Sequence, residues 1–143
     1  MRGQASIELL ITLGVVLAFT IPVLFLLLSV TSVGYENTSM AQAEATARSF
    51  SDSINLVYGQ GIGARRVVLL NLPTNTDQVV VEDNEVIITL TTSSGRFDAA
   101  APIFAQVRGD TLSRGGPIAG LLAVEIEAVE VGGEVQVQVA ILE

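Results

Sequence analysis

The chain lacks several residue types that carry enzyme chemistry. Its 143 residues include no cysteine and no histidine, which removes the thiol nucleophile, the commonest general base, the usual zinc ligands and any disulfide. A nucleophilic triad would need an unusual serine-based variant, and no spacing in the sequence suggests one. We therefore predict no catalytic residue, no cofactor and no metal centre.

Lysine is also missing, so the seven basic residues are all arginine. Fifteen acidic residues outnumber them and the net charge is -8, whereas proteins that bind phosphate backbones carry a basic stripe. Nucleic acid is thus not an expected partner. The acidic balance should keep the outer surface soluble.

Charge of either sign is absent from a long N-terminal segment. No charged residue lies between Glu8 and Glu36, and an apolar run of about 18 residues or more is long enough to cross a bilayer as a helix. A secretory signal peptide has a shorter apolar region that ends at a small-residue cleavage site. Ala41-Gln42-Ala43 could imitate that site, but it lies well beyond the run. The segment is therefore predicted to enter a membrane and to stay in the protein.

The segment that follows Gly34 is amphipathic. Its apolar residues recur at steps of three and four and so share one helical face; they are Met40, Ala43, Ala47, Phe50, Ile54 and Val57. The glycine-rich stretch 59–63 should end the helix. Its glycines do not form a phosphate loop, because no P-loop lysine exists in the chain. Pro22 is predicted to kink the helix, since proline removes one backbone hydrogen bond.

From Arg65 onward the hydrophobic period changes to two, which indicates strands. Turns are predicted at Asp83-Asn84 and Gly132-Gly133, and a bulge near Val129, where Glu130 would otherwise point inward. The predicted strands are 67–70, 78–82, 85–92, 103–107, 121–131 and 134–141. We expect an α+β protein in which a long N-terminal hydrophobic helix precedes a small antiparallel β head, either a sandwich or a partly closed barrel.

The residues before the apolar run form a recognisable pattern. Gly3, Gln4, Ser6, Glu8 and Leu10 resemble the class III signal of archaeal type IV pilin-like proteins. In that family a prepilin peptidase cuts before a glutamine that begins a Gln-x-Ser-x-Glu pattern. The resemblance implies cleavage between Gly3 and Gln4, and it covers residues 1 to about 30 closely. The short basic leader has a single basic residue, Arg2, where many relatives have more.

The resemblance also implies an organisation and a function. Residues 1–3 would be a cleaved leader, 4–33 a membrane and filament-core helix, 34–58 its amphipathic continuation and 59–143 the β domain. The mature chain would polymerise into a cell-surface filament, a pilus for surface or cell-cell adhesion, after insertion in the cytoplasmic membrane. Its partners would be other copies of itself, the prepilin peptidase and the pilus assembly machinery. Glu8 could pair with the α-amine that cleavage frees on Gln4, of its own or a neighbouring subunit, because a carboxylate beside an apolar run needs a partner unless it lies near the membrane interface. The alternative is that Glu8 simply marks the edge of the membrane.

Two further sites are open on the sequence. Asn37-Thr38-Ser39 is an N-glycosylation sequon just outside the predicted membrane segment. Glu82, Asp83 and Glu85 cluster at a predicted turn, but they lack the spacing of a calcium loop and such turns are usually only solvated.

Two other functions remain as alternatives. One is a signal-anchored membrane protein that does not polymerise and uses its β domain to bind a partner. The other is a subunit of an archaellum-type motility filament, whose signals differ after the cleavage point.

Overall fold

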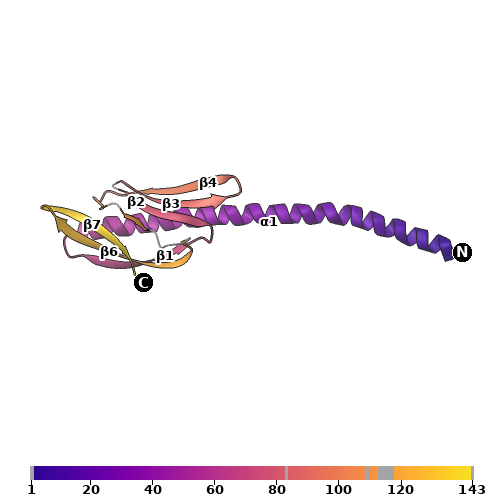
Figure 1. Cartoon of the computed structure of the whole chain (residues 1–143), viewed down its shortest axis with the longest axis horizontal. Helices are drawn as coiled ribbons and strands as arrows, with labels where there is room; N and C mark the ends of the chain where they lie inside the picture. Colours follow the sequence, from indigo (N-terminus) through magenta and orange to yellow (C-terminus); the bar gives the residue numbers. More distant parts are fainter. Residues whose placement is uncertain (1, 83, 109, 113–117, 143) are drawn as a thin grey trace. The chain divides into compact units, whose positions relative to one another are not determined.

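A computed structural model of the chain describes residues 2–82, 84–108, 110–112 and 118–142, with side chains from Ser6 onward except at 110 and 111. One long helix is followed by short strands (Figure 1). The elements are α1 (Arg2–Gln60), β1 (Arg65–Leu72), β2 (Thr76–Glu82), β3 (Glu85–Thr92), β4 (Gly95–Pro102), β5 (Asp110–Leu112), β6 (Gly120–Val131) and β7 (Glu134–Ile141). This is the expected α+β layout.

Two compact units make up the chain, Met1–Asn37 and Thr38–Glu143. The first contains only helix within the described residues, and its residues from Ser6 onward are almost all exposed. All the fully buried apolar side chains belong to the second unit. That unit therefore holds the hydrophobic core, which includes the C-terminal part of α1.

The part of α1 inside the second unit is the centre of the core. Ala43, Ala47, Phe50, Ile54 and Val57 have no exposed surface, and Met40 packs against them half-buried. The predicted apolar face is thus confirmed. Ser39, Ser51 and Ser53 are also buried, so the buried surface of the helix is wider than that face.

The strands form two separate antiparallel sheets, of order β1-β6-β7 and β4-β3-β2-β5. The helix lies between them (Figure 1) and bonds to both. Thr46 donates a hydrogen bond of 3.0 Å to the carbonyl of Asn71 in β1, and Ser51 donates to the carbonyl of Pro102 in β4. A sandwich and a partly closed barrel were both expectations for the strands; the helix is an added middle layer.

The predicted strand at 103–107 is wrong. These residues keep the in-and-out alternation, with Ile103, Ala105 and Val107 buried and Phe104 83% exposed. They form only one isolated bridge, between Val107 and Val137. The segment instead leads from β4 to β5 and passes β7 at Val107. The N–H of Ile103 donates to the carbonyl of Asn84, and the N–H of Phe104 donates to the side chain of Asn55.

Two strands were missed by the sequence analysis, and a bulge was misplaced. β4 contains three alanines, an aspartate and a glycine, which have low β propensity, and β5 is only three residues long. The β6 register continues without a shift through Val129 and Glu130, while the observed irregularity lies at Thr76/Gln78 in β2. Glu130 needs no bulge because it is exposed at the end of the hairpin.

Glycines end the helix and close the last hairpin as predicted. α1 ends at Gln60, and Gly61 and Gly63 have φ values of 85° and 87°, which residues with a Cβ rarely adopt. Gly132 and Gly133 also have positive φ, as a two-residue β-hairpin turn requires. Asp83 of the other predicted turn lies outside the described residues, although Glu82 and Glu85 on either side are paired.

Candidate functional site

The most unusual surface of the protein is the apolar helix of the first unit. The large hydrophobic side chains between Ile7 and Tyr35 are 47% to 73% exposed. Consecutive positions such as Leu24–Leu28 all belong to this set, and successive helical residues turn by about 100°, so every face of the helix is apolar. Between Ile7 and Tyr35, no side of the helix is uniformly polar.

Such a surface requires cover. Exposed apolar area is unfavourable in water by about 25 cal/mol per Å², and a helix that is hydrophobic all round is normally buried in protein or lipid. The helix is long and apolar enough to cross a membrane. Its most apolar stretch has a mean hydropathy of 2.7 and is not buried. An anchor or a signal sequence would satisfy the same test, and so would a helix that other copies cover.

Four hydroxyl groups in the apolar part of this helix donate to the carbonyl four residues earlier. Thr12 donates a hydrogen bond of 2.8 Å to the carbonyl of Glu8, Thr20 donates one of 2.7 Å to that of Val16, and Thr31 donates one of 2.8 Å to that of Leu27. Ser29 bonds Phe25 in the same way. These donors therefore need no water, which suits an apolar environment. Sequence reasoning had overlooked the pattern, although the four-residue spacing of helical carbonyls makes it readable.

Glu8 lies on the exposed helix one turn after Gln4, so the two residues share a face. Gly3 and Gln4 have helical backbone in α1, while their side chains lie outside the described ones. The structure thus places the predicted assembly pair on adjacent turns. Cleavage at Gly3/Gln4 and a bond between Glu8 and the freed amine remain predictions.

Pro22 lies inside α1, which continues on both sides of it. Because proline has no N–H, the carbonyl of Ala18, four residues earlier, loses its helical donor. The defect lies within the apolar segment, where membrane helices tolerate it. A kink at this position remains a prediction.

The predicted sequon lies where the two units meet. Asn37 is exposed and is the last residue of the first unit. Ser39, the hydroxyl residue of the sequon, is only 4% exposed. The exposed side chain of Asn37 is accessible for attachment of a glycan, and the presence of this glycan remains a prediction.

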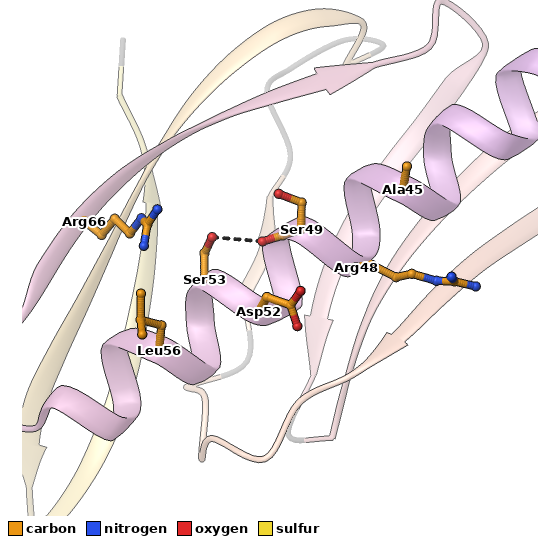
Figure 2. Close-up of a pocket in the computed structure, with 7 residues that line it drawn as sticks. All are labelled: Ala45, Arg48, Ser49, Asp52, Ser53, Leu56 and Arg66. Atoms are coloured by element: carbon orange, nitrogen blue, oxygen red, sulfur yellow. Dashed lines mark hydrogen bonds between the residues drawn. The ribbon is translucent and has the colours of Figure 1, made fainter.

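A second candidate site is a groove of about 650 Å³ on the C-terminal unit (Figure 2). Residues of α1 form its floor, and Arg66 of β1 lines its side. The α1 residues are the exposed Ala45, Arg48, Ser49, Asp52 and Leu56 and the buried Ser53. Ser53 donates a hydrogen bond of 2.8 Å to the carbonyl of Ser49, so its hydroxyl is satisfied within the helix. The charged side chains of the groove are exposed to solvent. The sequence analysis did not identify this groove, because the groove forms only where Arg66 of β1 lies beside α1.

The described residues contain no group of three acidic side chains that could hold a metal ion. Glu82 and Glu85 lie opposite each other in the strand register at the end of the β2–β3 hairpin. Asp83 between them is outside the described range. The apolar helix is therefore the strongest candidate for a functional surface, because its exposed apolar side chains need to be covered from water. Comparison of the chain with protein-family models, with curated proteins and with solved structures finds no match.

Proposed function

We propose that this protein is the structural subunit of an extracellular type IV pilus-like filament that mediates adhesion. The observation that carries the proposal is the helix whose every face is apolar and exposed. Before assembly the lipid of the cytoplasmic membrane covers it. In the filament the helices of neighbouring copies cover one another, and the C-terminal units remain outside.

The polar groups of the N-terminal segment fit this exchange of surroundings. The hydroxyls of Thr12, Thr20, Ser29 and Thr31 are bonded inside the helix, so these donors stay paired when the helix moves from lipid to a helical bundle. Glu8 is the one charged group at the start of the apolar run. After cleavage before Gln4, its carboxylate pairs with the new α-amine of its own or a neighbouring subunit, which fixes the depth of each helix in the core.

The assembly needs no catalytic residue. Apolar helices that leave the bilayer associate because exposure to water is unfavourable. A contact between two different surfaces of identical subunits continues indefinitely when its rotation does not close a ring. The prepilin peptidase and the assembly machinery supply the cleavage and the extraction from the membrane.

The test is the state of the protein sheared from producing cells. Microscopy should show fibres, and mass spectrometry should find a subunit that begins at Gln4. Glu8→Ala should lower the fibre yield about tenfold without preventing membrane insertion. Glu44→Ala is the control, since Glu44 has the same charge on the same helix and makes only an exposed 3.8 Å contact with Arg48.

Detergent-solubilised monomers that still begin at Met1 would contradict the proposal. They would favour instead a signal-anchored protein whose C-terminal unit binds a partner. An unchanged fibre yield in Glu8→Ala would remove the assembly role of Glu8 alone.

A further inference from the structure

The groove of the C-terminal unit contains a cation, Arg66, that forms no ion pair with any residue that the structure describes. In β1, Arg66 is in phase with Leu70 and Leu72, whose side chains face the core. The pleat therefore directs Arg66 to the core side as well, yet it is exposed and lines the groove. Among the described residues Arg66 forms no ion pair.

The adjacent Arg65 shows the contrast. It points to the opposite face of β1 and contacts Glu127 at 2.9 Å and Glu125 at 3.3 Å. The hydrogen bond to Glu127, followed by the two negative charges, raises the pKa of Arg65 above its ordinary value. One of two neighbouring arginines is thus satisfied within the chain, whereas the other is directed at a groove.

On β6, Glu130 is an anion in a comparable position near the end of a strand. Glu130 is in phase with Ile126 and Ala128, which are buried. At Glu130, however, β6 has passed the end of β1, because the pairing of these strands starts at Arg65 and Glu127. Residues 129–136 form a two-stranded arm that extends beyond the third strand (Figure 1).

The arm has the features of a contact element. Glu130 and Glu134 are exposed and, within the described residues, form no ion pair. Val131 at its tip is 42% exposed. The arm is held at its base, where Val135 packs half-buried against the core of its own unit. Its acidic, partly apolar tip complements a groove that carries two arginines, one aspartate and Leu56, which is 46% exposed.

We propose that the arm of residues 129–136 docks in the groove between α1 and β1 of a second copy of this chain, where Glu130 pairs with Arg66. The opposite charges attract in a chain whose net charge of -8 otherwise makes copies repel. Val131, which the pleat directs to the other face of the arm at its tip, and Leu56 bring apolar surface to the edge of the same contact. Figure 2 places Arg66 beside Leu56, at the end of the groove away from Arg48.

The contact joins two different surfaces, so after the first pairing one copy still has a free groove and the other a free arm. Such a heterologous contact propagates along a chain of subunits. It rests on the proposed filament function and adds to it a specific contact between the outer units. The helices would supply the apolar core, and the arm and groove would set the spacing of the subunits.

The first experiment exchanges the two charges in the full-length chain. Arg66→Glu alone and Glu130→Arg alone should each lower the fibre yield about tenfold, because like charges then meet in the contact. The double variant Arg66→Glu/Glu130→Arg should restore it, since each groove again meets an arm of opposite charge. Rescue by the double variant also excludes misfolding as the cause. A double variant as poor as the two single ones would overturn the proposal.

The second experiment uses the absence of natural cysteine in the chain. Leu56→Cys and Val131→Cys are introduced together, and intact producing cells are treated with a short thiol cross-linker. The pair should give a ladder of dimers, trimers and larger species that contain only this chain. Each single cysteine variant should stop at the dimer at most.

The outcomes separate the contact from the filament. Fibres without a ladder, or a cross-link to a different protein, would overturn the docking and leave the filament function intact. A ladder without fibres would support the contact and remove the filament. Neither fibres nor a ladder would overturn both.

Discussion

Replacing Phe50 by alanine tests whether α1 is the centre of the C-terminal core. The fragment 38–143 is the suitable background, because it keeps every buried residue of the unit and lacks the apolar helix. Phe50 has no exposed surface and packs in the cluster that joins both sheets. Removal of such a phenyl ring lowers the free energy of unfolding by about 3–5 kcal/mol, through lost burial and the cavity that remains.

That loss is a large part of the stability of a unit of this size, which is about 5–15 kcal/mol. Urea unfolding followed by circular dichroism is the assay. With an m-value of about 1–3 kcal/mol per molar, the midpoint should fall by about 2 M. Leu56→Ala, on the same helix but 46% exposed, should change the free energy of unfolding by less than about 1 kcal/mol.

Equal shifts for Phe50→Ala and Leu56→Ala would refute the reasoning. The helix would then lie outside the core, and the two sheets would be stable without it.

Three further predictions concern the same fragment and the same assay. Ser51→Ala should lower the free energy of unfolding by about 1–2 kcal/mol, because the carbonyl of Pro102 loses its buried donor, whereas Ser49→Ala at an exposed position should change little. Gly63→Ala should cost about 1–2 kcal/mol, since φ is 87°, while Gly59→Ala inside the helix should stabilise by up to about 1 kcal/mol; equal effects would contradict the turn. Arg65→Gln should destabilise less as salt is added. Because the pKa of Arg65 is raised, its contribution is complete at every pH below its ordinary range and is lost only as the pH rises through the raised value, so the difference from wild type should stay constant between about pH 7 and about pH 11.

The helix could be predicted almost completely from the sequence. Its two parts have strong and different patterns, one apolar throughout and one with buried residues at steps of three and four. Gly61 and Gly63 end it where predicted because their positive φ is a local property. Local signals of this kind need no knowledge of the rest of the fold.

The strands were predicted less well because their pairing depends on distant residues. Ile103, Ala105 and Val107 alternate as a strand does, and they are buried as predicted. Alternation reports only an extended segment with one covered face. A ladder also needs a free neighbouring edge, and this segment meets β7 at one position only.

The candidate sites divide in the same way. The apolar helix, Glu8, Pro22 and Asn37 are readable because they lie in one continuous stretch. The groove depends on Arg66 lying beside α1, about ten residues or more from the helix residues that line it. The sequence analysis recognised that Glu130 would point inward and explained this by a bulge, because the end of β1 could not be known from the sequence.

The internal hydrogen bonds of Thr12, Thr20, Ser29 and Thr31 limit which groups can fix the geometry of the proposed fibre core. These hydroxyls already donate to carbonyls of their own helix, so they give no directional contact to a neighbouring helix. Along the apolar segment, rotation and sliding of each helix would then be resisted only by the shapes of the apolar side chains. The directional contacts of the proposed fibre would therefore lie outside this segment, at Glu8 and between the C-terminal units.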